Sequence, residues 1–143
     1  MTRVRSPWPP ERAFAYMADL RNFAEWDPGV KASRQVEGEG PKLGSSYDVT
    51  VAGVGRDLTL RYELNEFVEG KQFVATAESS TLTSVDTVSV VAEGDGSIVT
   101  YDAELTLNGI LSLGDIFLRL AFRRIGDRAA AGMRKALEGE DAG

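Results

Sequence analysis

The chain has 143 residues, no cysteine, no histidine and a formal net charge of −6 at pH 7. Its length predicts one domain spanning residues 1–143. The missing residue types exclude disulfides, a histidine-containing catalytic triad, and metal sites built on cysteine or histidine, so we expect neither a metal nor a cofactor. The acidic balance argues against nucleic acid as a partner.

The first residues, Met1 to Arg5, run into prolines without an apolar stretch, a start unlike a secretion signal. Nowhere do about 18 apolar residues follow one another, as a membrane-spanning helix would require. We therefore expect a cytoplasmic protein without a transmembrane segment.

Residues 9–20 are predicted to form a helix. Two prolines suit its start, Glu11 suits the positive end of the helix dipole, and Phe14, Met17 and Leu20 form an apolar stripe. A further short turn is expected at Phe23–Trp26, closed by the sequence Asp27-Pro28-Gly29.

From Val30 to Leu107 the apolar residues recur with a period of two, which indicates β-strands. We expect about six strands joined by short turns, among them Gly53-Val54-Gly55 and Gly94-Asp95-Gly96. Such a series predicts an antiparallel meander with one buried face. The polar ends of the chain are expected to fray or to pair weakly.

Residues 115–137 are predicted to form a long helix. One side is apolar and the other carries the arginines of this segment; Ile125 should be buried and Arg124 exposed. The order helix, meander, long helix is an α+β arrangement, in which a twisted sheet can wrap around the last helix. The predicted apolar side comprises Leu118, Ala121, Phe122, Ile125, Ala129, Gly132, Met133 and Ala136.

Three stretches resemble bacterial SRPBCC proteins, the START and polyketide cyclase/dehydrase-like members of the Bet v 1-like superfamily. They are Pro10 to Tyr16, Asp19 to Val30, and the last hairpin from Val88 to Tyr101. The resemblance implies a helix-grip fold: a curved antiparallel sheet wrapped around a long C-terminal helix, with short N-terminal helices and an apolar cavity between them. Because few residues precede the prolines, the first strand of the family would be short. The family includes lipid carriers and cyclases, so the resemblance predicts fold better than function.

A cavity is also suggested by the small residues on the inner side of the last helix, which leave volume for a ligand unless aromatic residues of the sheet fill it. A leucine at Gly132 should then fill the cavity without loss of stability. A hydrophobic or aromatic small molecule, lipid or polyketide-like, is the expected partner. The predicted ligand-binding residues are Tyr47, Leu60, Tyr62, Phe73, Asp86, Val88, Tyr101, Phe122, Gly132 and Met133.

Asp86 is the candidate catalytic residue because it shares the strand face of Val88 and Val90. A buried carboxylate needs partners, for which Tyr62, Tyr101 and Arg56 are available, and its raised pKa would suit acid–base chemistry. The alternative interpretation places Asp86 at an exposed strand end. Tyr47, Tyr62 and Tyr101 could orient a ligand or simply belong to the core.

Three functions remain open at this point: binding of a hydrophobic ligand, a cyclase or dehydratase-like reaction using Asp86 and cavity tyrosines, and protein interaction. The last rests on an apolar excess around Leu113 and Phe117, which could also support a homodimer or a peripheral membrane contact. The residues of this predicted patch are Ile110, Leu111, Leu113, Ile116, Phe117 and Leu120.

Overall fold

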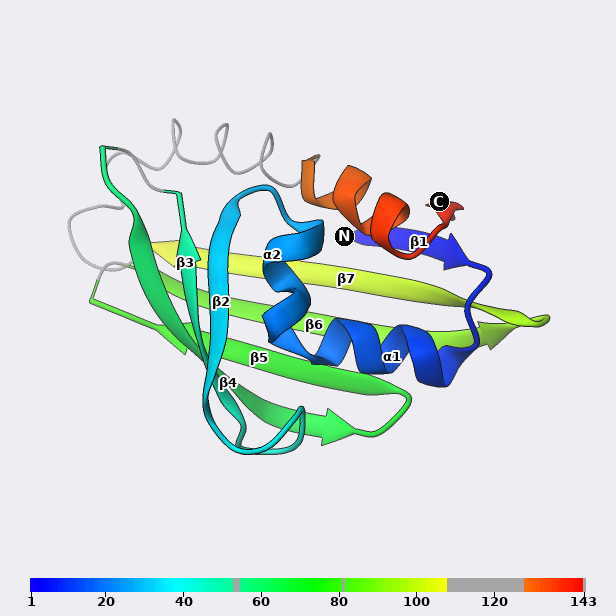
Figure 1. Ribbon diagram of the computed structural model, residues 1–143, viewed down its shortest axis with the longest axis horizontal. Coiled ribbons are helices and arrows are strands. Elements are labelled where there is room, and N and C mark those ends of the chain that lie inside the picture. Colours follow the sequence, from blue (N-terminus) through cyan, green and yellow to red (C-terminus); the bar gives the residue numbers. More distant parts are fainter. Residues whose placement is uncertain (53–54, 81, 108–127, 143) are drawn as a thin grey trace.

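The structure is a computed structural model that describes residues 1–52, 55–80, 82–107 and 128–142. These residues form one eight-stranded antiparallel sheet with the strand order β2-β3-β4-β5-β6-β7-β1-β8, and helices lie against one of its faces (Figure 1). The strands are β1 (Thr2–Ser6), β2 (Val30–Glu37), β3 (Ser46–Val51), β4 (Leu58–Val68), β5 (Gln72–Glu78), β6 (Leu82–Glu93), β7 (Gly96–Leu107) and β8 (Glu140–Asp141).

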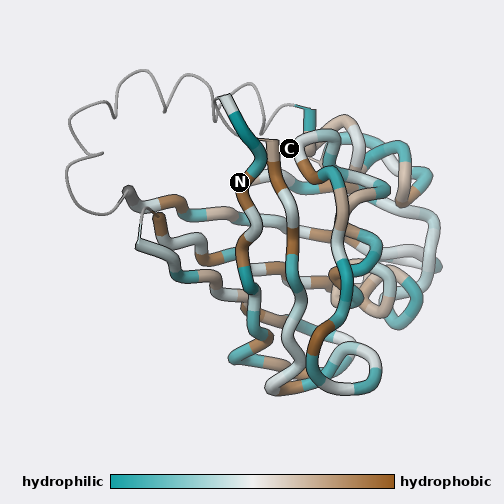
Figure 2. Tube along the Cα trace, turned by 60° about the vertical axis from the view of Figure 1, so that its left-hand side comes forward, coloured by the Kyte–Doolittle hydropathy of each residue, from teal (hydrophilic) through white to brown (hydrophobic). Residues whose placement is uncertain are grey.

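The meander predicted between Val30 and Leu107 is confirmed as the six successive strands β2 to β7. Along β6, buried residues alternate with more exposed ones from Ser84 to Val90, so that one face of the strand lies in the core. Figure 2 shows hydrophobic and hydrophilic residues alternating along several strands. The Gly94-Asp95 turn joins β6 to β7 as expected, whereas residues 53–54 lie outside the described residues.

The N-terminal end of the chain pairs over more residues than the sequence predicts, whereas the C-terminal end pairs weakly, as expected. β1 pairs with β7 from Thr2↔Tyr101 to Ser6↔Ser97, and β8 pairs with the outer side of β1. The buried Ser6 hydroxyl donates to the carbonyl oxygen of Leu137 at 2.7 Å and accepts from the backbone N–H of Trp8 at 3.1 Å. The N-terminal strand is therefore fixed to the end of the C-terminal helix.

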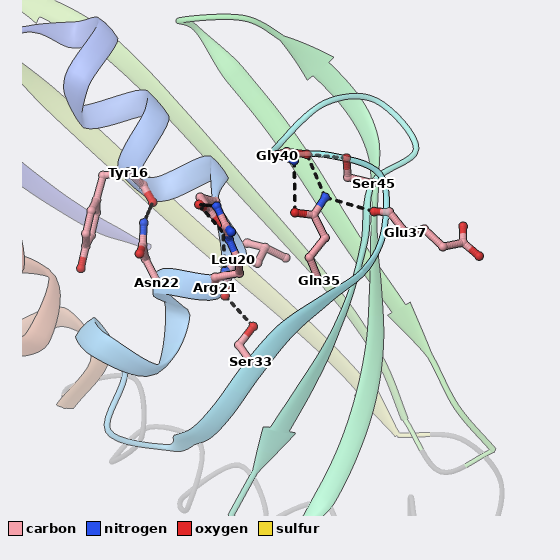
Figure 3. Close-up of polar contacts among 10 residues, drawn as sticks. Tyr16, Leu20, Arg21, Asn22, Ser33, Gln35, Glu37, Gly40 and Ser45 are labelled. Carbon is pink, nitrogen blue, oxygen red and sulfur yellow. Dashed lines mark hydrogen bonds and ion pairs between the residues drawn. The ribbon is translucent and has the colours of Figure 1, made fainter.

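The N-terminal helical segment comprises α1 (Pro10–Ala18), the 3-10 helix η1 (Leu20–Asn22) and α2 (Phe23–Trp26). The first predicted helix ends earlier than expected because Asp19 has an extended backbone, while its carboxylate accepts from the backbone N–H of Arg21. The Ser33 hydroxyl of β2 donates to the carbonyl oxygen of Leu20 at 2.6 Å, and the Asn22 amide donates to that of Tyr16 at 3.0 Å (Figure 3). These bonds hold η1 against β2 and so position α2 over the sheet.

The described part of the C-terminal helix covers residues 128–136. Ala129 and Met133 are buried on its inner side with Leu137 just beyond its end, while Arg128 and Lys135 are exposed, in agreement with the predicted apolar side. Residues 108–127 lie outside the described residues. The expectations for Phe122, Arg124 and Ile125, and for the apolar patch around Leu113 and Phe117, fall within that range.

Candidate functional site

The described residues surround a cavity of about 260 Å³, called the pocket below. The sheet, α2 and its following turn, and the start of the described C-terminal helix all contribute to its wall. Most of the wall is apolar, with Phe23, Val30, Leu60, Leu82, Leu105 and Ala129 among its residues. The polar side chains that line it are Thr2, Asp27, Tyr62, Ser84, Asp86 and Tyr101.

Asp86 lies in the middle of the sheet, with only 3% of its surface exposed. Its register partners are Ala75 in β5 and Ala103 in β7. Paired residues of neighbouring antiparallel strands project from the same face, and alanine reaches no further than Cβ. The two small side chains therefore leave space beside the Asp86 carboxyl group, and Ala103 lines the pocket together with Asp86.

Three hydroxyl groups form a hydrogen-bonded network with this carboxylate, called the Asp86 network below. Tyr101 Oη donates to Asp86 Oδ2 at 2.8 Å, and Ser84 Oγ donates to Asp86 Oδ1 at 2.8 Å. Tyr62 Oη donates in turn to Ser84 Oγ at 3.0 Å. Both carboxylate oxygens thus have partners, as a buried charge requires.

The sheet register explains why Tyr62 reaches Ser84 across an intervening strand. Tyr62 in β4 pairs with Ala77 in β5, and Ala77 pairs with Ser84 in β6, so that the three residues form one row across the sheet. The small Ala77 side chain leaves room for the phenol to extend over it. A larger residue at this position would occupy the space through which Tyr62 reaches Ser84.

Burial dominates the electrostatics of the site. It raises the pKa of Asp86 to about 6, although the hydrogen bonds from Tyr101 and Ser84 act in the opposite direction. Burial also raises the pKa values of Tyr101 and Tyr62 above that of free tyrosine, and the nearby Asp86 charge adds to both shifts. At neutral pH the tyrosines are therefore neutral, while Asp86 titrates only about one unit below neutrality.

A second carboxyl group, Asp27, lines the same pocket from the turn between α2 and β2. Its Oδ1 accepts from the backbone N–H of Gly29 at 2.8 Å, and burial raises its pKa. Within the described residues its Oδ2 receives no hydrogen bond. The charge of Asp27 is close enough to contribute to the raised pKa of Asp86.

Aromatic contacts hold the network from the helix side. Trp26 stacks on Phe23 with 4.8 Å between ring centroids and meets Tyr101 edge-on at 5.3 Å. Phe23 also contacts the Tyr62 ring edge-on at 6.2 Å. Each tyrosine of the network is therefore fixed by a ring of α2 as well as by its hydroxyl.

The interpretation of Asp86 as an exposed strand end is wrong, because the strand extends beyond it to Leu82 and the carboxyl group is buried. Of its three suggested partners, Tyr101 bonds to it directly and Tyr62 acts through Ser84. Arg56 is exposed.

The structure brings four of the predicted ligand-binding residues together at the pocket: Leu60, Tyr62, Asp86 and Tyr101. The others in the described range are Tyr47, Phe73, Val88, Gly132 and Met133, and none of them is among the residues that line it. Four of these are buried in the core. Tyr47 is fully buried there, and its hydroxyl oxygen has no hydrogen-bond partner among the described residues.

Gly132 requires a specific correction. A Cβ atom at this position would collide with the backbone carbonyl oxygen of Trp26. The glycine therefore allows the helix to approach α2 closely and does not contribute space to the pocket. The expectation that leucine would be tolerated at Gly132 is wrong.

Asp27 and Ser84 are among the residues of the site that the sequence did not predict. Asp27 was interpreted only as part of a turn, and nothing local to it shows that its carboxyl group is buried beside residues far along the chain. Ser84 could have been predicted, because alternate residues of a strand project from one face and Ser84 alternates with Asp86 and Val88.

The architecture defines an α+β protein in which an antiparallel sheet and flanking helices surround a small, largely apolar pocket. Residues 2–138 match the family model described as polyketide cyclase / dehydrase and lipid transport, and the chain belongs to this family. No curated protein sequence matches the chain closely enough to count as a relative.

Solved structures share the fold at low sequence identity. A START superfamily protein from Mycobacterium smegmatis is 15% identical with a TM-score of 0.75, and the match covers 95% of this chain and 94% of that one. A protein from Thermus thermophilus is 17% identical with a TM-score of 0.70, covering 94% and 93%. The di-domain ARO/CYC StfQ from the steffimycin biosynthetic pathway is 13% identical with a TM-score of 0.69, covering 95% of this chain and 49% of that one. At these identities the likeness concerns the fold alone. None of the described helices is long and apolar enough to cross a bilayer.

Proposed function

We propose that this protein binds a small hydrophobic or aromatic molecule in the pocket. The observation that carries the proposal is the combination of an apolar wall with a buried polar network at one place in it. Binding sites for small molecules are commonly apolar cavities with a few polar groups that orient the ligand. Membership of a family described by polyketide and lipid chemistry supports the same function.

The size of the pocket favours a ligand of about two fused rings. A volume of about 260 Å³ lies just below the usual range of roughly 300–1,000 Å³ for ligand sites. A naphthalene derivative is therefore a suitable probe, and its fluorescence reports transfer from water to an apolar site.

The test fills the pocket by mutation. Ala103 lines the pocket in β7, so Ala103→Leu should abolish binding of naphthol. Because the larger side chain enters empty space, the change should cost less than the roughly 1–3 kcal/mol of overpacking a filled core. Ala92→Leu is the matched control, because Ala92 is exposed in β6 and does not line the pocket. Absence of binding to the wild-type protein, or equal binding to both variants, would contradict the proposal.

A second candidate function is acid–base catalysis by Asp86, favoured by its pKa of about 6 and its position at the pocket. In heavy water the carboxylate would take up the hydroxyl deuteron of bound naphthol, while a water molecule gives a deuteron to the neighbouring ring carbon and becomes deuteroxide. Deuteroxide then removes the hydrogen of that carbon as HOD, and Asp86 returns its deuteron to the ring oxygen, which leaves deuterium in the ring and regenerates the carboxylate.

NMR can follow this exchange directly. The wild-type protein should accelerate it roughly 10²-fold or more over buffer, and Asp86→Asn should remove the acceleration. Tyr16→Phe is the control, since Tyr16 bonds to Glu25 and does not line the pocket. Equal exchange with wild-type and Asp86→Asn protein would leave binding as the only proposed function.

A further inference from the structure

The direction of the hydrogen bonds in the Asp86 network is fixed by its chemistry. An ionised carboxylate only accepts, so both Tyr101 and Ser84 must give it their hydroxyl hydrogens. Ser84 then has no hydrogen left for Tyr62, and Tyr62 must be the donor in the bond between them. All three hydroxyl hydrogens are therefore committed within the protein.

What remains available to a molecule in the pocket is a set of acceptors. Tyr62 and Tyr101 each retain free lone pairs on Oη, and Asp27 Oδ2 receives no hydrogen bond from the described residues. Among the described residues that line the pocket, Thr2 alone has a side-chain hydroxyl hydrogen not committed to such a bond. A polar group of a ligand therefore meets mainly acceptors.

The charge of the pocket has the same consequence. Asp27 and Asp86 both line it, and no lysine or arginine does so among the described residues. The amino group of Met1, which also belongs to the wall, lies 3.9 Å from Asp102 and is largely exposed to solvent. A ligand carboxylate would thus enter an apolar space beside two acidic groups without a buried cation to balance it.

We propose that the pocket selects apolar molecules that carry a hydrogen-bond donor, such as a phenolic hydroxyl, and discriminates against carboxylates and against molecules with acceptors alone. The inference rests on the proposed binding function and defines its ligand class. It distinguishes the expected ligand from a fatty acid, whose only polar group is a carboxylate.

The test uses four naphthalenes substituted at the same ring position: naphthol, naphthaldehyde, methylnaphthalene and naphthoate. Titration at neutral pH should show that naphthol binds the wild-type protein roughly tenfold or more tightly than each of the other three. One hydrogen bond to a buried acceptor accounts for a difference of this size. Methylnaphthalene matches naphthol in size, so the comparison isolates the donor.

Asp86→Asn should remove most of the preference for the donor, an effect that a merely structural role of Asp86 would not produce. An asparagine amide donates one of its hydrogens to either Tyr101 or Ser84, and in either case one hydroxyl hydrogen of the network is released. The affinity ratio of naphthol to naphthaldehyde should therefore fall by roughly tenfold in this variant. Tyr16→Phe, which removes a hydroxyl that bonds to Glu25 and does not line the pocket, is the control and should keep the wild-type preference for the donor.

The possible results separate the inference from the function on which it rests. If no neutral naphthalene binds the wild-type protein, the proposed binding function itself fails. If naphthol, naphthaldehyde and methylnaphthalene bind equally, or naphthoate binds best, the protein has a binding pocket but the donor selection is wrong. An unchanged ratio in folded Asp86→Asn would also overturn the inference.

Discussion

The backbone carbonyl oxygen of Trp26 lies where the Cβ atom of any residue other than glycine would stand at position 132. This contact brings the C-terminal helix directly against the end of α2. Trp26 in turn holds the ring of Tyr101, which bonds to Asp86. The close approach at Gly132 is thus connected through two side chains to the polar end of the pocket.

We predict that Gly132→Ala destabilises the fold. Alanine gains about 1 kcal/mol of helix propensity over glycine, but the forced separation from α2 should exceed this gain. Overpacking of this kind typically costs about 1–3 kcal/mol, and more where backbone must move. Urea denaturation measures the change, and Lys135→Ala, at an exposed position of the same helix, is the control. Stability equal to or above that of the wild type would contradict the contact.

The buried Asp86 should make stability depend on pH. Because its pKa is raised from 3.8 to about 6, the native state binds more protons than the unfolded state between these values. Stability from this group is therefore present at low pH and is lost as pH rises through about 4 to 6. The full loss amounts to roughly 3 kcal/mol, at 1.36 kcal/mol for each pKa unit.

The difference in the free energy of unfolding between wild-type protein and Asp86→Asn isolates this effect from the effects of other carboxyl groups. Burial raises the pKa of Asp27, so the stability that Asp27 contributes is also lost as pH rises. Arg61 lowers the pKa of Asp48, so the stability that Asp48 contributes is lost as pH falls. The stability of Asp86→Asn relative to the wild type should rise by roughly 2–3 kcal/mol between pH 4 and pH 7. A difference that does not vary with pH would show that Asp86 titrates normally.

Tyr101 should lower the Asp86 pKa through its hydrogen bond. Tyr101→Phe removes this bond and leaves Asp86 Oδ2 without its donor, so the Asp86 pKa should rise above its wild-type value of about 6. Carbon NMR of the carboxyl group follows the titration. Tyr16→Phe, which removes a hydroxyl bonded to Glu25, should leave the Asp86 pKa unchanged. A lower pKa in Tyr101→Phe would contradict the assigned bond.

Ser6 should contribute more to the stability of the fold than the small size of its side chain suggests. Ser6→Ala removes the donor to Leu137 and the acceptor for the Trp8 N–H, and leaves both backbone groups unpaired in a buried region. We expect a loss of about 1–3 kcal/mol in the free energy of unfolding. Ser89→Ala, at a half-buried position of β6, is the control and should change stability by less than about 0.5 kcal/mol.

The strands were predictable because a half-buried sheet imposes a period of two on the residues themselves. The same parity placed Asp86 on the face of Val88 and Val90, which is where it lies. The inner side of the described C-terminal helix followed similarly from the spacing of Ala129 and Met133. Each of these features depends on neighbours a few residues away.

The contacts across elements were not predictable in this way. Asp27 and Asp86 lie far apart in the sequence, and only the docking of α2 on the sheet brings both to one pocket. The helix periodicity assigned Gly132 to the inner side but could not reveal that a backbone carbonyl lies against it. Which face of each element is apolar follows from the amino-acid sequence, because it depends on the spacing of nearby residues. Which polar groups meet within those faces follows only from the fold, because strand register and helix docking set their partners.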